Sequence, residues 1–177
     1  DKVKKEKVIG RFGWKANEPN LRQQNADAFL GDIGITTSIN PNENCTTADC
    51  NNATNGGSPE FPNVFLDAIE LYSQTLAPPY RKNAKEVDVL TGKKIFYDLK
   101  CTSCHTPSFI TGSHSIPALS NQTIFPYTDM LLHDMGDDLS DNRPDFHAEG
   151  NEWKTPPLWG IGQFMTVNGH TRYMHDG

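Results

Sequence analysis

The chain has 177 residues, enough for one ordinary domain or two very small ones. Only 36% of them are hydrophobic, and 14 Gly with 12 Pro indicate a loop-rich fold. The 16 basic and 22 acidic residues leave a net charge of -6, so no nucleic acid is expected as the main partner. No apolar run approaches the ~20 residues that cross a bilayer, so no membrane span is expected.

The spacing of apolar side chains predicts three helices. The first begins after Asn20, a favourable N-cap residue. The second is the clearest and covers 59–77, with Ser58 as its cap and Pro59 at its first position. The third covers about 88–100, and its narrow inner stripe consists of Val89, Gly92, Phe96 and Leu99.

The segments between and after these helices are predicted to be loops. Residues 36–58 are almost free of large apolar side chains, and a disulfide between Cys45 and Cys50 is expected to pin them. Beyond residue 105 we expect turns and short helices, and the sequence offers no convincing strand. The predicted fold class is therefore mainly α with long loops.

Residues 101–105 carry the clearest chemical motif, Cys-Thr-Ser-Cys-His. The C-x-x-C-H pattern is typical of c-type haem attachment. One turn of chain presents the thiols of Cys101 and Cys104 to one haem edge, where they form thioethers. His105 follows at once and is the predicted iron ligand. The motif also follows a predicted helix, and a haem would supply the core that the composition lacks.

Three other interpretations of the cysteines remain open. A redox-active C-x-x-C would need a βαβ setting, which the sequence does not show. A zinc site built from both cysteine pairs would use Cys45 and Cys50 from a long loop. The third is that the C-x-x-C-H pattern arises by coincidence and binds nothing. A disulfide and covalent haem would both fit an oxidising compartment, so we expect a periplasmic or other location outside the cytoplasm.

Five segments give the chain a specific resemblance to a known family. It resembles the bacterial di-haem cytochrome c oxidoreductases, also called thiol oxidoreductases, which are related to di-haem cytochrome c peroxidases and to MauG. The segments are Gly10–Ala16, Asp32–Thr36, Cys101–Pro107, Tyr127–Asp129 with Leu131–Gly136, and Glu152–Gly160.

The resemblance implies two mainly helical, cytochrome c-like haem domains, one peroxidatic and one feeding it electrons. This chain departs from that pattern because it has one C-x-x-C-H motif. Gly10-Arg11 resembles the close of one domain, and His175-Asp176-Gly177 the close of the next. The chain therefore resembles an internal slice. Residues 1–58 are interpreted as the end of a preceding domain with a disulfide-pinned loop. Residues 59–177 are interpreted as a C-terminally incomplete haem domain holding one covalent haem c.

The resemblance also bears on the second axial ligand of the iron. In the relatives this ligand lies in a helix after His-Asp-Gly, so it cannot be assigned here. We expect the distal side of the haem to be incompletely covered. Its iron would then be partly high-spin or would take a substitute sixth ligand. The side chains able to serve are those of His133, Met135, His170 and Met174.

Several other residues carry weaker hypotheses. Trp14 lies in a segment that runs between haems in the relatives, so electron transfer and simple packing are both open. Trp153 and Trp159 are expected to wall the haem pocket. His133 and Arg143 are candidates for haem propionate contacts. Asp32 is a candidate acid–base group for peroxide chemistry.

Two functions from different classes follow. The first is electron transfer within a di-haem peroxidase-like oxidoreductase, with an electron-donor or acceptor protein as partner and a small oxidant such as peroxide as substrate. The second is a non-catalytic electron-carrier cytochrome domain with both axial positions filled. A third interpretation is an interaction module without haem, stabilised by zinc or a disulfide.

Overall fold

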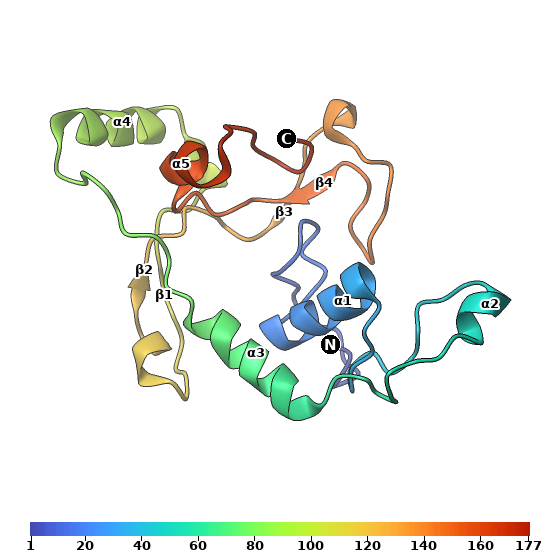
Figure 1. Ribbon diagram of the computed structural model, residues 1–177. Helices are drawn as coiled ribbons and strands as arrows, with labels where there is room; N and C mark the ends of the chain where they lie inside the picture. Colours follow the sequence, from blue (N-terminus) through green and yellow to red (C-terminus); the bar gives the residue numbers. More distant parts are fainter. The chain divides into compact units, whose positions relative to one another are not determined.

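The computed structural model describes the backbone of residues 1–177 and all side chains except that of Asn51. The chain divides into two compact units, Asp1–Leu76 and Ala77–Gly177. The sequence-based boundary between residues 58 and 59 rests on the family resemblance and not on compactness, and it remains a prediction. Figure 1 shows the elements of both units along the chain.

The first unit contains three helices. These are α1 (Leu21–Ile33), α2 (Ala48–Asn51) and α3 (Asn63–Thr75). The predicted cap of α1 is confirmed, because the Asn20 side chain accepts a hydrogen bond from the main-chain N–H of Gln23 over 2.9 Å. The helix ends at Gly34, whose φ of 70° lies in the left-handed region that glycine adopts without a Cβ penalty.

Helix α3 begins four residues later than the sequence predicts, at Asn63 rather than at Pro59. The cause is a tertiary contact. The main-chain N–H of Glu60 donates to the Thr36 hydroxyl over 3.0 Å, and the Glu60 carboxylate accepts from the N–H groups of Thr36 and Gly56. Phe61 N–H also bonds to the Thr36 carbonyl. These bonds tie residues 60–61 to the segment after α1, so the helix starts only after Pro62.

The core of the first unit lies between α1 and α3, which pack side by side. Ala26 and Leu66 are fully buried there. The guanidinium of Arg22 on α1 reaches the carboxylates of Asp67 and Glu70 on α3, at 2.5 and 3.0 Å. The predicted disulfide is confirmed in the loop between these helices, where Cys45 and Cys50 bracket most of α2 with their Cα atoms 5.7 Å apart.

The second unit combines two helices with short turns and strands. Its helices are α4 (Val87–Asp98) and α5 (Phe164–Asn168), and its 3₁₀ turns are η1 (Cys101–Ser103), η2 (Pro117–Leu119), η3 (Asp137–Leu139) and η4 (Ile161–Gln163). Its strands are β1 (Phe109–Ile110), β2 (Thr123–Ile124), β3 (Leu132–Asp134) and β4 (Glu152–Lys154). β1 pairs with β2, and β3 with β4, both antiparallel. The sequence missed these strands because two or three residues are too few to show a period of two.

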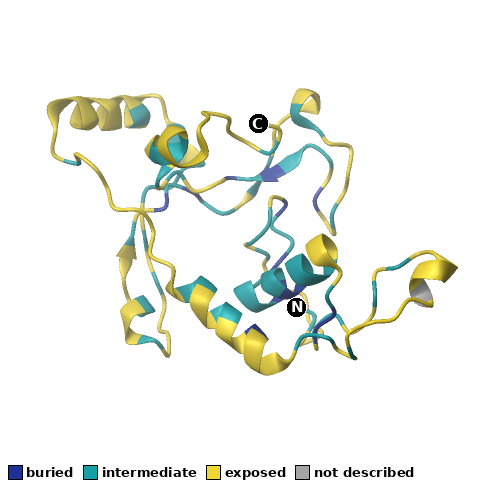
Figure 2. Cartoon of the chain, in the orientation of Figure 1, coloured by how far each residue is buried: buried dark blue, intermediate teal, exposed yellow. Residues whose placement is uncertain are grey.

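Helix α4 lies where it was predicted, but the prediction of a packed inner stripe is wrong. No described residue of α4 is buried, and Leu99 is 71% exposed. A Cβ added at Gly92 would meet nothing within 4 Å. Figure 2 shows the helix exposed along nearly its whole length. Protein side chains therefore leave most of the apolar surface of α4 uncovered.

The structure confirms the coarse fold class, which is mainly helical with long loops. Among the described residues, no helix is long and apolar enough to cross a membrane.

Candidate functional site

The Cys-Thr-Ser-Cys-His motif forms one tight turn directly after α4. Lys100 adopts a left-handed φ of 59° and ends the helical run, and η1 begins at Cys101. The main-chain N–H of His105 then closes the turn on the Cys101 carbonyl over 3.0 Å. Both cysteines have free thiols and are half-buried. The local fold thus carries two reduced sulfurs and one imidazole on a single turn.

The imidazole of His105 is held by a main-chain carbonyl. Its Nδ1 lies 2.8 Å from the carbonyl oxygen of Tyr127. A carbonyl oxygen can only accept a hydrogen bond, so Nδ1 carries a proton, and in the neutral imidazole Nε2 then keeps its lone pair. A metal-binding histidine is commonly oriented by a bond of this kind, which also raises its basicity as a ligand.

The segment that supplies this carbonyl is itself anchored. Thr128, which is fully buried, donates from its hydroxyl to the Thr155 carbonyl over 2.5 Å and accepts from the Met130 N–H over 2.8 Å. Its own N–H donates to the Thr106 carbonyl over 3.1 Å. These bonds tie Thr128 to Thr106, the residue after His105, and to Thr155, the residue after strand β4. The carbonyl of Tyr127, the residue before Thr128, is therefore held in place.

An aromatic side chain from α4 packs against the same pair. The Phe96 ring lies 6.2 Å from the His105 ring and 5.8 Å, edge to face, from the Tyr127 ring, measured between centroids. Phe96, a member of the predicted stripe, thus contacts the histidine of the motif. It places the last turn of α4 against the imidazole.

A second polar cluster adjoins the motif. His133 Nε2 lies 2.8 Å from a carboxylate oxygen of Asp129, and His133 Nδ1 lies 3.9 Å from the sulfur of Cys104. Burial by itself raises the pKa of Asp129. The hydrogen bonds from the Leu131 N–H, His133 and Thr155, together with the charge of His133, outweigh it and leave that pKa below its usual value. The carboxylate is therefore ionised near neutral pH.

Many large apolar side chains of the second unit are exposed to solvent. They are Val87, Leu90, Ile95, Leu99, Ile110, Phe125, Leu131, Met165 and Val167. A soluble domain rarely leaves so many uncovered in one unit of this size. Together with two free thiols and an imidazole with a free Nε2, they fit a large, flat, apolar group attached at this turn. The donor set thus suits a haem.

The four candidates for the second axial ligand differ in their surroundings. His133 is occupied by Asp129 and Cys104. The Nδ1 of His170 accepts a hydrogen bond from the Arg172 N–H, and Met135 and Met174 are 42% and 43% exposed. Among the described side chains, no hydrogen bond or ring contact joins any of the four to His105.

The remaining candidates are less connected to the motif. Trp14 is 53% exposed and Asp32 is exposed, both in the first unit. Arg143 and Trp159 are exposed in the second unit. Trp153 alone is buried, at 8% exposure.

Trp153 occupies a defined position on the β3–β4 ribbon. It stands opposite His133 in the strand register. Its indole N–H donates to the Leu139 carbonyl over 2.9 Å, and its ring stacks on that of His175 at 3.5 Å. Trp153 therefore links this ribbon to the His-Asp-Gly segment.

Sequence reasoning missed three residues that organise the site, namely Phe96 as a contact of the imidazole, Tyr127 and Asp129. Tyr127 acts through its carbonyl, which any residue type would supply, so its side chain gives no signal. A left-handed φ of 54° at Tyr127 marks an unusual backbone that sequence alone does not reveal. Asp129 stands four residues before His133, and that spacing was the available signal.

Comparison with known protein families places the chain in one of them. A C-x-x-C-H turn on a mainly helical, loop-rich chain is the arrangement expected of a protein that binds haem c. Residues 5–177 match the family model described as "Di-haem oxidoreductase, putative peroxidase". The chain belongs to this di-haem oxidoreductase family. No curated protein and no solved structure matches the chain. The four-cysteine zinc site considered from the sequence is wrong, because Cys45 and Cys50 are joined to each other.

Proposed function

We propose that the chain carries one haem c, bound through thioethers to Cys101 and Cys104, with His105 as an axial ligand of the iron. The hydrogen bond between His105 Nδ1 and the Tyr127 carbonyl carries this proposal most directly. It leaves the Nε2 lone pair free for a metal, as an axial imidazole requires. The family, which is named for two haems, supports the same cofactor.

The residues around the turn have separate roles in this proposal. The two sulfurs fix the macrocycle to the chain, and the Tyr127 carbonyl orients the imidazole and increases its electron donation. The exposed apolar side chains of α4 and α5 are the ones that would pack against a bound haem and exclude water from it. When bound, haem supplies an iron that changes between the ferric and ferrous states and so carries one electron.

Electron transfer within a di-haem, peroxidase-like oxidoreductase is the function that these features support best. The family description favours peroxide as the oxidising substrate. A protein that donates or accepts electrons is the expected partner. The disulfide between Cys45 and Cys50 supports a location outside the cytoplasm, where such bonds persist. The cytochrome c-like character of residues 59–177 is part of the same proposal.

The alternative function is that of a non-catalytic electron carrier. A carrier keeps both axial positions of its iron filled, whereas a peroxidatic centre keeps one open for peroxide. Absorbance and electron paramagnetic resonance spectra of the oxidised and reduced haem protein separate the two. A high-spin ferric signal that hydrogen peroxide or cyanide changes at once supports the peroxidase-like function. A fully low-spin iron, unchanged by either ligand, supports the carrier instead.

A further inference from the structure

Cys104, Asp129 and His133 form a cluster that the haem-binding role does not fully use. One sulfur, one carboxylate oxygen and one imidazole nitrogen from these residues lie within 4.8 Å of one another, and all three side chains are half-buried. We propose that, before haem is attached, the chain binds one zinc ion at Cys104, Asp129 and His133. This inference goes beyond the proposed function, and zinc binding itself does not depend on it.

The ligand types and spacing suit zinc. Cysteine sulfur, histidine nitrogen and carboxylate oxygen are its usual protein ligands, at about 2.0–2.3 Å. Tetrahedral ligands at such bond lengths are about 3.5 Å apart. The sulfur of Cys104 lies 3.9 Å from Nδ1 of His133, and a carboxylate oxygen of Asp129 lies 2.8 Å from Nε2 of the same ring. Zinc can bind only one of these nitrogens, so zinc binding requires Asp129 to leave Nε2 and turn toward the Nδ1 side, or Cys104 to turn toward the Nε2 side. Three protein ligands leave the fourth position to water. A thiolate and a carboxylate together balance the charge of Zn²⁺.

The backbone holds the three ligands in place before any metal arrives. His133 is the central residue of β3 and pairs with Trp153 on β4. Asp129 is held near it by two bonds, one to the His133 ring and one from the Leu131 N–H at 3.0 Å. Cys104 is the C-cap residue of η1, and its main-chain N–H donates to the Cys101 carbonyl. The His133 side chain is 34% exposed, which gives a cation access from solvent.

Zinc and haem would exclude each other, because both need the sulfur of Cys104. Zinc bound there also keeps Cys104 from forming a disulfide with Cys101 until haem arrives. The site differs from the four-cysteine arrangement, since it uses neither residue of the Cys45–Cys50 disulfide.

Zinc titration of the full 177-residue chain, produced without haem and competed against a chromophoric chelator, tests the proposal. We expect one zinc per chain. Asp129→Asn and His133→Gln each remove a direct ligand, so each should weaken binding by at least the about 10- to 100-fold that loss of an outer-shell partner costs. The matched control is Cys101→Ser, which changes the other thiol of the same turn and should leave the affinity nearly unchanged. Equal loss from Cys101→Ser and Cys104→Ser, with no effect of Asp129→Asn, would mean that the cysteine pair alone binds zinc and would overturn the proposal.

Cobalt substitution gives a second readout that needs no variant. Co²⁺ in place of zinc should produce the visible bands of a tetrahedral site and a thiolate-to-cobalt charge-transfer band. Wild-type chain that binds Co²⁺ without the charge-transfer band has no sulfur ligand, and the proposal is then wrong. Circular dichroism establishes that each variant keeps its helices, so that lost binding is not mistaken for lost folding. The protein with haem attached to its cysteines should bind no zinc at this site. If haem attachment fails, the zinc result still stands by itself.

Discussion

The imidazole of His105 donates from Nδ1 to the carbonyl oxygen of Tyr127 over 2.8 Å, across 22 residues of sequence. This bond connects the attachment turn to the segment before β3. It fixes both the tautomer and the orientation of the histidine. The strength of this bond should therefore influence the reduction potential of the haem that we propose there.

Thr128→Val tests that influence without touching His105. The substitution removes a buried hydroxyl and leaves the Thr155 carbonyl and the Met130 N–H without their partner. We expect a loss of about 1–3 kcal/mol in the free energy of unfolding. The Tyr127 carbonyl becomes less firmly held, the imidazole donates less electron density, and the reduction potential should rise. Chemical denaturation and a redox titration measure the two effects.

Thr123→Val is the matched control for this prediction. Thr123 lies on strand β2 and is exposed, so its change should alter neither stability nor potential by a measurable amount. A Thr128→Val protein with an unchanged potential would show that the carbonyl is held independently of the hydroxyl.

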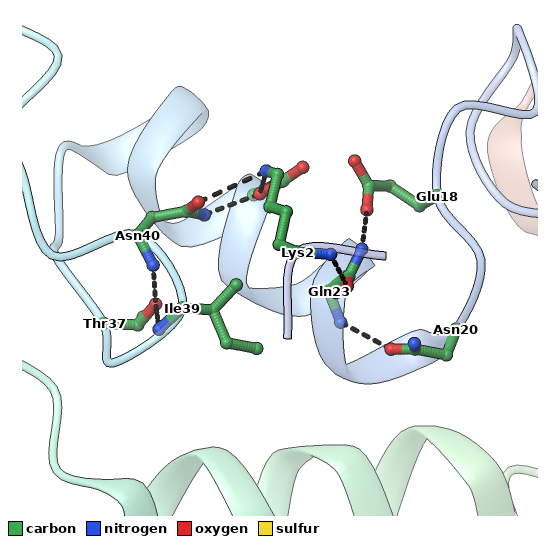
Figure 3. Close-up of polar contacts among 8 residues, drawn as sticks. Lys2, Glu18, Asn20, Gln23, Thr37, Ile39 and Asn40 are labelled. Carbon is green, nitrogen blue, oxygen red and sulfur yellow. Dashed lines mark hydrogen bonds and ion pairs between the residues drawn. The ribbon is translucent and has the colours of Figure 1, made fainter. Parts of the chain in front are cut away.

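Glu18 should make the stability of the first unit depend on pH. It is 2% exposed and accepts a hydrogen bond from Gln23 at 3.1 Å. Burial, with a contribution from nearby Asp27, raises the pKa of Glu18 to about 7. Figure 3 shows the surrounding network, in which Lys2 reaches Gln23 and Asn40.

The sign of this effect follows from the raised pKa. Between pH 4.5 and about 7 the folded chain keeps a proton that the unfolded chain releases. The stabilisation is complete below pH 4.5 and is lost as the pH rises through 7, by an amount on the order of 2 kcal/mol. Asp27 acts in a separate range. Burial raises its pKa, but hydrogen bonds with Glu18, Lys2 and Asn40 lower it overall, so its stabilisation is lost on acidification.

Urea denaturation of wild type and Glu18→Gln between pH 5 and pH 8 measures the contribution of Glu18. The amide has no proton to lose, so the variant should show a flatter profile over this range. Parallel profiles for the two proteins would contradict the assignment. Glu6→Gln serves as the control, because Glu6 is an exposed carboxylate and its change should leave the profile as in wild type.

Reduction of the disulfide should weaken the first unit locally. Cys45 and Cys50 are five residues apart, and closing so short a loop is worth about 2 kcal/mol in the chain-entropy description. A reductant should therefore lower the denaturation midpoint of wild type but not that of a Cys45→Ala/Cys50→Ala variant. Alkylation of unreduced protein should leave both cysteines unmodified, and labelling at either one would contradict the bond.

Local signals in the sequence predicted the elements that local chemistry controls. The Asn20 cap is one, since a side chain three residues from its donor decides it. The C-x-x-C-H turn and the Cys45–Cys50 pair are others, because their spacing is short. The family resemblance predicted the membership that the family comparison then showed.

Contacts between distant residues decided the features that the sequence could not predict. Thr36 and Glu60, 24 residues apart, delay the start of α3. Tyr127 orients His105 through a main-chain atom, which no residue type reveals. The apolar stripe of α4 is not buried against another part of the chain. The sequence pattern could not show this, because a helix can direct apolar residues toward a cofactor as well as toward another helix.

Covalent attachment of haem through Cys101 and Cys104 is the central claim, and extraction under denaturing conditions tests it most directly. The protein, matured in a host that attaches haem c, is denatured in acid and extracted with an organic solvent. Thioether bonds survive this treatment, so we predict that the colour stays with the polypeptide and that a Cys101→Ala/Cys104→Ala variant loses it to the solvent. Haem that leaves the wild-type chain for the organic phase, or a chain that acquires none, would contradict the account.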